Sequence, residues 1–281
     1  MFQIQQIKGG IVSRHDHAIV KDNSNVVARV ALRALSTLAP NNSNGPDNSE
    51  KHRSLADSAR TDDLLDKLYF AAIGQDPTHF LQTFLELRRA GCSSDFLAFD
   101  LIPDVARRLG ASWVDDVISF ADVTIGCARL QSALRQLPDD VPMYVDTCNG
   151  VEQNCLVAVP IGAQHTMGAM VLAKQLRQAR QRVVVDLSAH KATLSHLACQ
   201  HDFDIVLISA TCGENPAEVQ ALIETCRAHW GACKVIVGGS FCDLNDDVLC
   251  TVHADRFTND WQEALDLSSR DFTRVEIPLL G

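Results

Sequence analysis

The sequence predicts an α/β protein in which a doubly wound, parallel, Rossmann-like sheet follows a four-helix-bundle cap. After residue 150, short β-branched runs alternate with helical segments, which is the pattern of repeated β-α units. These runs are apolar almost throughout, as in strands that are covered on both faces. Before residue 140, apolar residues recur at helical spacing in four successive segments, which indicates a small bundle.

The first 60 residues differ from both of these parts. A chain of 281 residues is longer than one small core needs, which favours two domains plus an extension. Residues 25–39 predict a helix that is apolar on most faces and needs a partner surface, with Ser24 or Asn25 as its N-cap. Residues 40–52 are polar, contain Pro and Gly, and indicate a flexible linker. The predicted organisation is an N-terminal extension over 1–60, a helical cap over 61–140 and an α/β domain over 150–281.

Four helices are expected in the cap, and their ends carry the usual signals. The first begins at Thr61 with acidic residues, and the second begins at Asp76-Pro77 and ends at Gly91. The third is interrupted around Gly110, and the fourth ends at Pro138. The predicted helices cover residues 61–74, 76–91, 95–120 and 119–138.

The α/β domain is expected to contain five strands separated by helices. Ligands in such sheets bind at the carboxyl ends of the strands, so function is expected in the loops after residues 161, 187, 209 and 238. The predicted strands are 154–162, 182–187, 204–211, 233–239 and a weaker 255–260. The predicted helices are 166–181, 191–201, 216–229, 243–251 and 260–269.

Composition excludes several classes of protein. No run of 18 apolar residues is present to span a bilayer, and the N-terminus lacks the apolar core of a signal peptide, so we expect a cytoplasmic protein without membrane contact. The ten cysteines form no C-x-x-C pair, which favours buried, reduced thiols over a zinc site or a disulfide scaffold.

Net charge argues against direct binding to nucleic acid. The chain carries a formal charge of −10, distributed as +3 over residues 1–60, −8 over 61–153 and −5 over 154–281. Both folded domains would therefore be repelled by a phosphate backbone. Any role in nucleic-acid function is expected to be indirect.

A group of small and polar residues lies at the predicted rim of the sheet. His165 and Gly168 follow the first strand, and forty residues separate Gly168 from Ser209 at the end of the third. Twenty-six residues separate Thr211 from Gly238-Gly239 at the end of the fourth strand. Taken singly, a loop His, a strand-end Ser or Thr and a Gly-Gly turn are common structural features. Their shared position at one rim is what indicates a ligand site.

This spacing resembles the base-off, His-on cobalamin-binding domain, whose pattern is Asp-x-His-x-x-Gly, Ser-x-Leu and Gly-Gly, and the resemblance covers residues 154 to about 270. It implies that His165 is the lower axial ligand of cobalt and that the benzimidazole tail enters beside the sheet. Ser209 and Thr211 would line the tail pocket, and Gly238-Gly239 would leave room for the nucleotide loop.

Two positions depart from that pattern. Ala163 stands where the family has the Asp that orients the imidazole, and Thr211 stands where Leu is common. Gln164 is a candidate for the missing hydrogen bond to the ligand, although an exposed Gln is the plainer interpretation.

The cap carries a second resemblance, over residues 109–123. In cobalamin proteins with a helical cap, a Gly-x-x-Trp segment lies over the upper face of the corrin, which makes Trp113 the candidate lid. Light-sensing transcription factors of the adenosylcobalamin type have a His and a Glu where this chain has Val114 and Val123. An upper His ligand at this site is therefore not expected.

Together, residues 107–137 and 159–179 resemble the AerR/PpaA antirepressors of photosynthesis gene expression, and the similarity covers most of residues 61–270. The resemblance implies a light- or redox-responsive cobalamin protein that is not an enzyme. It also implies a protein partner, a DNA-binding repressor of the CrtJ/PpsR type.

Other functions use the same architecture. A corrinoid methyl carrier also combines a helical cap with a cobalamin domain, whereas a mutase would need a large barrel for which this chain is too short. A haem sensor would use His165 as its iron ligand, and an interaction domain would bind no cofactor. Two further histidine features are the pair His15 and His17, interpreted as solvated, and His190, expected near the crevice.

Overall fold

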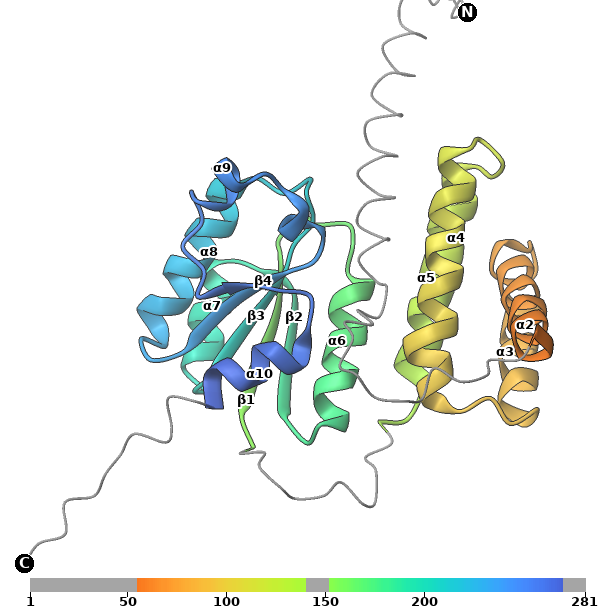
Figure 1. The fold of residues 1–281 in the computed structure, drawn as a ribbon, viewed down its shortest axis with the longest axis horizontal. Helices are drawn as coiled ribbons and strands as arrows, with labels where there is room; N and C mark the ends of the chain where they lie inside the picture. The colour runs from red at the N-terminus through yellow and green to blue at the C-terminus, as the bar shows by residue number, and fades with distance from the viewer. Residues whose placement is uncertain (1–54, 140–151, 270–281) are drawn as a thin grey trace, which may run out of the picture.

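The computed structural model describes residues 55–139 and 152–269, which form a helical bundle beside an α/β domain (Figure 1). The helix predicted over residues 25–39, the linker after it and the pair His15 and His17 lie outside the described residues. Among the helices of the described part, none combines the length and the apolar composition needed to cross a membrane.

The bundle confirms the predicted helical cap. Asp76 caps α3 by accepting a hydrogen bond from the Thr78 backbone N–H at 2.8 Å, and Ser119 forms a capping box with Asp122 at the start of α5. The π-helix η1 runs directly into α4. The bounds are α2 (Leu55–Ile73), α3 (Pro77–Arg89), η1 (Phe96–Leu101), α4 (Ile102–Val114) and α5 (Phe120–Gln136).

Three details of that prediction were wrong, and one is that the third helix ends at Val114 rather than at residue 120. The first helix begins at Leu55 rather than Thr61, so it reaches into the stretch predicted as extension. No break occurs at Gly110, which lies inside α4 and is buried in the bundle. A glycine costs a helix about 1 kcal/mol, and burial of the apolar face of α4 outweighs that cost.

Close helix packing holds the bundle together. A Cβ added to Gly126 of α5 would lie 2.8 Å from Leu109 Cδ1 of α4, so the two helices approach closely at this point. Arg129 of α5 donates hydrogen bonds to the carbonyl oxygens of Ala72, at 2.7 Å, and Gly74, at 2.5 Å, and so satisfies the end of α2. The largest fully buried side chains of this core include Leu68, Leu97, Leu101, Ile102, Leu109 and Leu130.

The α/β domain contains a five-stranded parallel sheet in the order β2-β1-β3-β4-β5, which confirms the predicted fold class. The interior strand β1, which pairs with β2 and β3, is buried along almost its whole length, as its apolar sequence predicted. The strands are β1 (Asn154–Pro160), β2 (Arg182–Ala189), β3 (Ile205–Ser209), β4 (Lys234–Gly238) and β5 (Arg256–Phe257).

Helices cover both faces of this sheet (Figure 1). Side chains of α6 (Met167–Gln178) and α10 (Trp261–Ser269) pack on one face. Those of α7 (Lys191–Ala198) and α8 (Pro216–His229) pack on the other. The segment predicted as a helix over 243–251 is instead split between a 3-10 helix η2 (Ser240–Asp243) and a short α9 (Asp246–Leu249).

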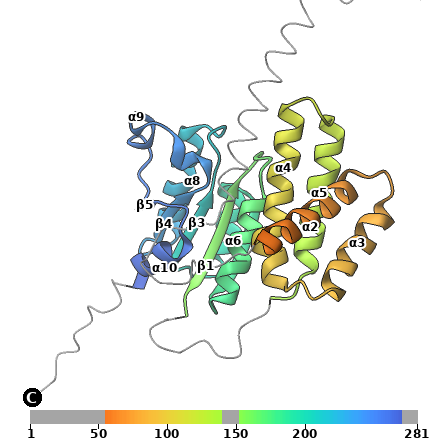
Figure 2. The ribbon, with the colours of Figure 1, turned by 45° about the vertical axis from the view of Figure 1, so that its right-hand side comes forward.

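Helix α6 joins the two parts of the molecule (Figure 2). Ala169, Ala173 and Leu176 on one side pack against the sheet, whereas Met167 and Val171 belong to the core of the bundle. The bundle is thus packed directly against the α/β domain and shares a helix with its core.

The strand order determines where a ligand crevice should form. The chain leaves β1 toward β2 on one side, and the next parallel strand, β3, lies on the other side of β1. The strand order therefore reverses between β1 and β3, and in open α/β sheets ligands bind outside the carboxyl ends of the strands at this switch point.

Candidate functional site

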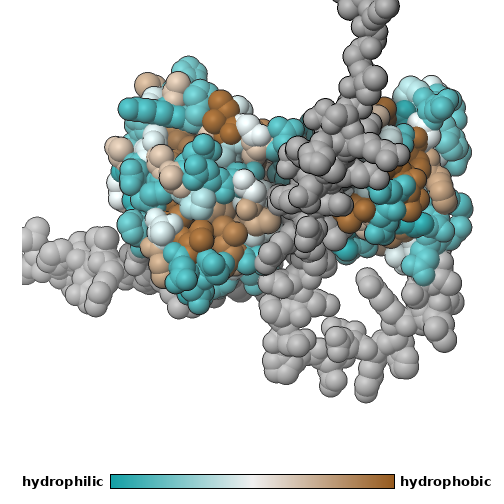
Figure 3. All heavy atoms as spheres, turned by 90° about the horizontal axis from the view of Figure 1, so that it is seen from above, coloured by the Kyte–Doolittle hydropathy of each residue, from teal (hydrophilic) through white to brown (hydrophobic). Residues whose placement is uncertain are grey.

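A cavity of about 360 Å³ lies at the carboxyl ends of the strands, between the sheet and the bundle. Figure 3 looks down on this end of the molecule. The cavity is lined by the β1–α6 loop and the ends of β3 and β4, and across from these by η1 and α5. Seven of the predicted site residues line this cavity. They are Gln164, His165, Gly168, Ser209, Thr211, Gly238 and Gly239.

His165 is placed by the loop that leaves β1. Gly162 turns the chain with φ of 85°, a conformation that favours glycine, and brings the imidazole to the cavity wall. Burial lowers the pKa of His165 below its usual value of 6.5, so the ring is neutral at pH 7. Within the described residues, no hydrogen bond joins this ring to another residue. A neutral imidazole of this kind is a good metal ligand.

Glu214 brings a negative charge toward His165. Its carboxylate accepts a hydrogen bond from the backbone N–H of Thr211 and partly opposes the fall in the pKa of His165. Ala163, where the family pattern has Asp, has no carboxylate to offer. Glu214 lies beyond the motif in the β3–α8 loop, and the spacing of the motif contains no signal that would identify it.

Ser209 and Thr211 stand where β3 ends. Ser209 pairs in register with Gly238 of β4, which confirms the prediction that the two strand ends lie together. Thr211 is buried, and its hydroxyl accepts a hydrogen bond from the Gly213 backbone N–H at 3.4 Å. Both residues therefore present small polar side chains to the same wall of the cavity.

Gly238 and Gly239 are required by the protein's own backbone. A Cβ added to Gly239, whose φ is 89°, would lie 2.1 Å from the Ala210 carbonyl oxygen. A Cβ added to Gly238 would lie 2.9 Å from the Thr258 carbonyl oxygen. The Asn259 side chain also accepts a hydrogen bond from the Gly239 N–H at 2.6 Å. The two glycines line the cavity as predicted. In this structure, the absence of their side chains makes room for neighbouring loops of the protein itself.

Gly168 and Gln164 flank His165. Gly168 lies in the first turn of α6 and faces the cavity. Gln164 is exposed, and its amide donates to the Gly162 carbonyl oxygen at 3.0 Å. Its amide nitrogen therefore bonds within its own loop rather than with His165.

Trp113 is not among the residues that line the cavity. It lies in the last turn of α4, packs against the edge of the bundle core and has its ring centroid 5.6 Å from that of Phe120. Val114 beside it is half-buried, and Val123 is buried in the bundle core. His190 is also not among the lining residues. It directly precedes α7, and its Nδ1 lies 2.8 Å from the Ser188 carbonyl oxygen.

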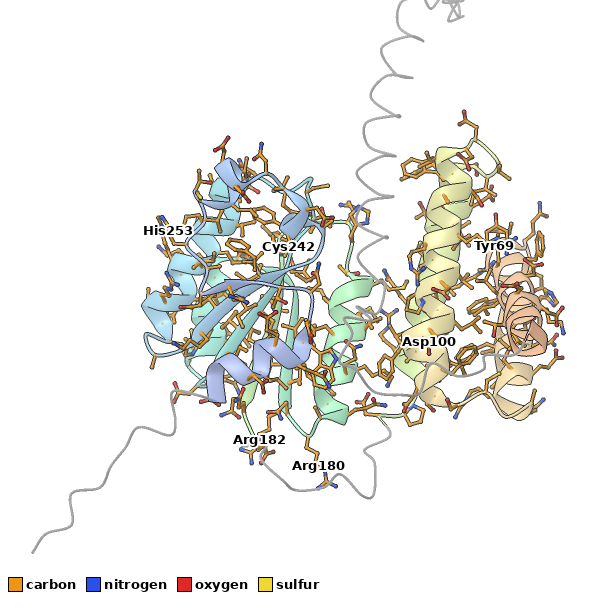
Figure 4. All side chains as sticks on the ribbon, viewed as in Figure 1. Tyr69, Asp100, Arg180, Arg182, Cys242 and His253 are labelled. Carbon is orange, nitrogen blue, oxygen red and sulfur yellow. The ribbon has the colours of Figure 1, made fainter. Side chains whose placement is uncertain are left out.

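Several lining residues escaped the sequence analysis. Asp100 lies on the part of the bundle that faces α6 (Figure 4) and belongs to η1, and π-helical turns are frequent at functional sites. Burial raises the pKa of the Cys127 thiol to about 11, so this thiol stays protonated. The clearest available signal was the predicted fifth strand, because the loop that follows it also lines the cavity. The missed residues include Phe99, Asp100, Cys127, Gln131, Thr258, Asn259, Asp260 and Trp261.

Comparison with known proteins agrees with this geometry. Residues 154–256 match the family model of the B12 binding domain. An uncharacterized 20.5 kDa protein of Rhodobacter capsulatus, from the bchF-crtJ intergenic region, is 34% identical over 179 residues, which are 63% of this chain and 92% of the relative.

Among solved structures, the Methanosarcina barkeri monomethylamine corrinoid protein has a similar fold. The TM-score is 0.57 at 14% identity, over 75% of this chain and 99% of that one. The match to the Rhodobacter protein covers nearly all of its length. The chain therefore belongs to the family of this Rhodobacter capsulatus protein, and its α/β part is a B12-binding domain.

Proposed function

We propose that this protein is a cobalamin-binding transcriptional regulator, an antirepressor of the AerR/PpaA type, and not an enzyme. The observation that carries the proposal is His165, a neutral imidazole at the switch point of a B12-binding domain. Its ring faces a cavity that the strand ends and the bundle enclose together.

His165 is the proposed lower axial ligand, with cobalamin bound base-off and His-on. A depressed pKa means that no proton has to leave the ring before it ligates cobalt at pH 7. The cavity beside it, at about 360 Å³, is of a size that holds a small-molecule group. Ser209 and Thr211 would border the benzimidazole tail there, and Trp113 on the bundle would lie toward the upper face of the corrin. When bound, the cobalt would supply coordination chemistry that light or redox state can change.

Regulation is proposed to act through protein contact. The relative from the bchF-crtJ intergenic region supports a partner of the CrtJ/PpsR repressor type, because the name of its region includes crtJ. The net charge of −10 favours contact with a basic DNA-binding protein in the cytoplasm over contact with DNA itself. A bound cofactor would fix the bundle over the sheet and change the surface that the repressor meets.

The first test is retention of cofactor. Protein incubated in the dark with hydroxocobalamin and then desalted should keep a corrin absorption spectrum with a base-off shift, and H165A should lose that shift. H253A is the matched control, because His253 is an exposed histidine away from the cavity (Figure 4). Retention of haemin in place of the corrin would identify a haem sensor, and retention of neither would identify an interaction domain.

The second test concerns the partner. Capture of the repressor should depend on cobalamin and on illumination, and H165A should remove that dependence. If the corrin is retained but capture of the repressor is unchanged by cofactor, light and H165A, the regulatory proposal fails. That outcome would leave a corrinoid methyl carrier as the better interpretation.

A further inference from the structure

Helix α6 presents one row of side chains to the bundle, and each member of the row makes a contact there. The members are spaced four residues apart, which places them on the same side of the helix. The row, here called the α6 row, consists of Thr166, Met170, Lys174 and Gln178. Their partners in the bundle are, in the same order, Gln131, Arg135, residues 137–139 and Asp95. The first three partners follow one another along α5 and its end, so the two helices meet in step.

The first member of the row stands next to the proposed cobalt ligand. Thr166 follows His165 directly and is the N-cap residue of α6. The hydroxyl of an N-cap Thr usually accepts a hydrogen bond from the first turn of its own helix, but that of Thr166 does not. It accepts a hydrogen bond from the Gln131 side chain of α5, at 3.2 Å. This hydroxyl therefore joins the His165 loop, residues 161–166, to the bundle.

Other hydrogen bonds of residues 162–166 stay within the neighbouring chain. The Ala163 N–H donates to the Pro160 carbonyl oxygen at 3.1 Å, and the Gln164 amide donates to the Gly162 carbonyl oxygen at 3.0 Å. Among the hydrogen bonds that the structure describes for these residues, the one from Gln131 is the one that comes from the bundle. The position of the bundle can therefore act on the loop that carries His165.

The bundle end of this bond is itself held in place. Leu130 and Leu134, on either side of Gln131, are buried in the bundle core. Within two turns of Gln131, the end of α5 is anchored to α6, because the buried Lys174 donates to the carbonyl oxygens of Leu137 and Pro138, at 2.8 and 2.9 Å. Gln131 thus reaches Thr166 from a fixed position.

We propose that Gln131 is a positioning residue for the cobalt ligand, which acts through Thr166 to hold the His165 loop where the imidazole binds cobalt. This inference rests on the proposed function. Hydrogen bonds that orient a metal ligand from outside raise the affinity for the metal. Coupling between two sites is reciprocal, so cobalamin bound through His165 would in turn favour the docked position of the bundle. Gln131 would then be the link between cofactor binding and the surface that a partner meets.

The affinity for hydroxocobalamin, measured by titration in the dark, tests this positioning. Q131L removes the donor and T166V removes the acceptor, each with little change in volume. Each variant should bind about fivefold more weakly, because a net hydrogen bond changes an equilibrium by about that factor. Q131L/T166V should be no weaker than either single variant, because both changes remove the same bond. T166S keeps the hydroxyl and should bind like the wild type.

Q136L is the matched control for Q131L. Gln136 is an exposed glutamine on the same helix, and its amide donates to Ser132 within α5. Q136L should leave the affinity for hydroxocobalamin unchanged.

Hydrogen exchange supplies a second measurement that a purely structural role of Gln131 would not change. Cobalamin should slow exchange of the amides of residues 127–135 in the wild type and in Q136L. In Q131L this cobalamin-dependent slowing should be roughly fivefold smaller.

The possible outcomes separate this inference from the proposed function. If the wild type binds hydroxocobalamin and H165A loses the base-off shift, but Q131L and T166V bind as tightly as the wild type, the positioning role fails and the proposed function stands. Additive losses in Q131L/T166V would also overturn it, because the two residues would then act separately. A wild type that does not bind hydroxocobalamin overturns both. A fivefold loss common to Q131L, T166V and the double variant, and absent from Q136L, supports the positioning role.

Discussion

The sheet wall of the cavity contains two glycines and small polar residues at the ends of β3 and β4, whereas the bundle wall contains larger residues of η1 and α5. On the sheet side, Gly238 and Gly239 let neighbouring carbonyl oxygens approach to distances that no side chain would permit. On the bundle side, Phe99, Asp100 and Gln131 reach toward the cavity from helices. We therefore expect the first wall to tolerate less change in shape than the second.

The joint between the two parts shows the same contrast. Near the cavity, the bundle is joined to α6 by a hydrogen bond of 3.2 Å from Gln131 to Thr166. Farther along α6, the buried Lys174 donates to the carbonyl oxygens of Leu137 and Pro138 and to the Asp139 carboxylate, at 2.6 to 2.9 Å. The bundle is thus held most firmly at the end of α5 away from the strand ends, which suits a wall that adapts to a ligand.

The largest expected effect is on the sheet wall. G239A should lower the free energy of unfolding by about 4 kcal/mol, because the new Cβ combines left-handed strain with a clash against Ala210. G162A is the matched control, since Gly162 has a similar φ of 85° but nothing within 4 Å of the added Cβ. It should cost only about 1 to 2 kcal/mol. Equal losses in urea unfolding would show that the sheet wall is less tightly packed than the structure indicates.

The next effect concerns the joint at Lys174. K174M removes a buried ammonium group from three acceptors and should cost about 3 kcal/mol. R182M serves as the comparison, because Arg182 pairs with Glu152 on the surface, where an ion pair contributes at most about 1 kcal/mol (Figure 4). Should the two variants unfold at the same urea concentration, the bundle is not anchored at this point.

A smaller effect is expected where α5 begins, on the bundle side. S119A removes the oxygen that accepts a hydrogen bond from the Asp122 N–H at 3.2 Å and should cost about 1 kcal/mol. S132A changes the same residue type in the middle of α5 and should be close to neutral, because Ala favours helix interiors. Thermal unfolding of both variants measures the contribution of this cap, and a loss in S132A equal to that in S119A would contradict it.

The last effect is a pH dependence at His165. Because its pKa is lowered on folding, the unfolded chain binds a proton between that pKa and 6.5 that the folded chain does not. Stability should therefore fall as the pH drops below 6.5, and H165A should flatten this dependence. E214Q removes the charge that opposes the shift and should lower the pKa of His165 further, as NMR titration of the imidazole would show.

E218Q is the control for that titration, because Glu218 is an exposed carboxylate in the first turn of α8. It should leave the pKa of His165 close to that of the wild type. A shift of equal size in both variants would mean that His165 responds to overall charge, and that Glu214 has no specific position beside it.

Much of the sheet and the strand-end part of the site could be predicted from local pattern. Apolar runs such as 154–160 and 205–209 have a length and composition typical of buried strands, and the α/β order then brings their ends to one edge. His165, Ser209 and Gly238 follow from this order. The break predicted at Gly110 failed, because a local propensity of about 1 kcal/mol is smaller than the gain from packing α4 in the bundle.

The sequence by itself determined the strands, the helical cap and the residues that stand at the strand ends, because each of these depends on neighbours within a few residues. Only the tertiary structure decided that Glu214 approaches His165, that Lys174 joins α6 to the end of α5, and that the loop after β5 closes the cavity. These contacts join residues far apart in the chain, or depend on how a loop is packed. Their positions follow from how the layers pack against one another, which the periodicity of a single segment does not encode.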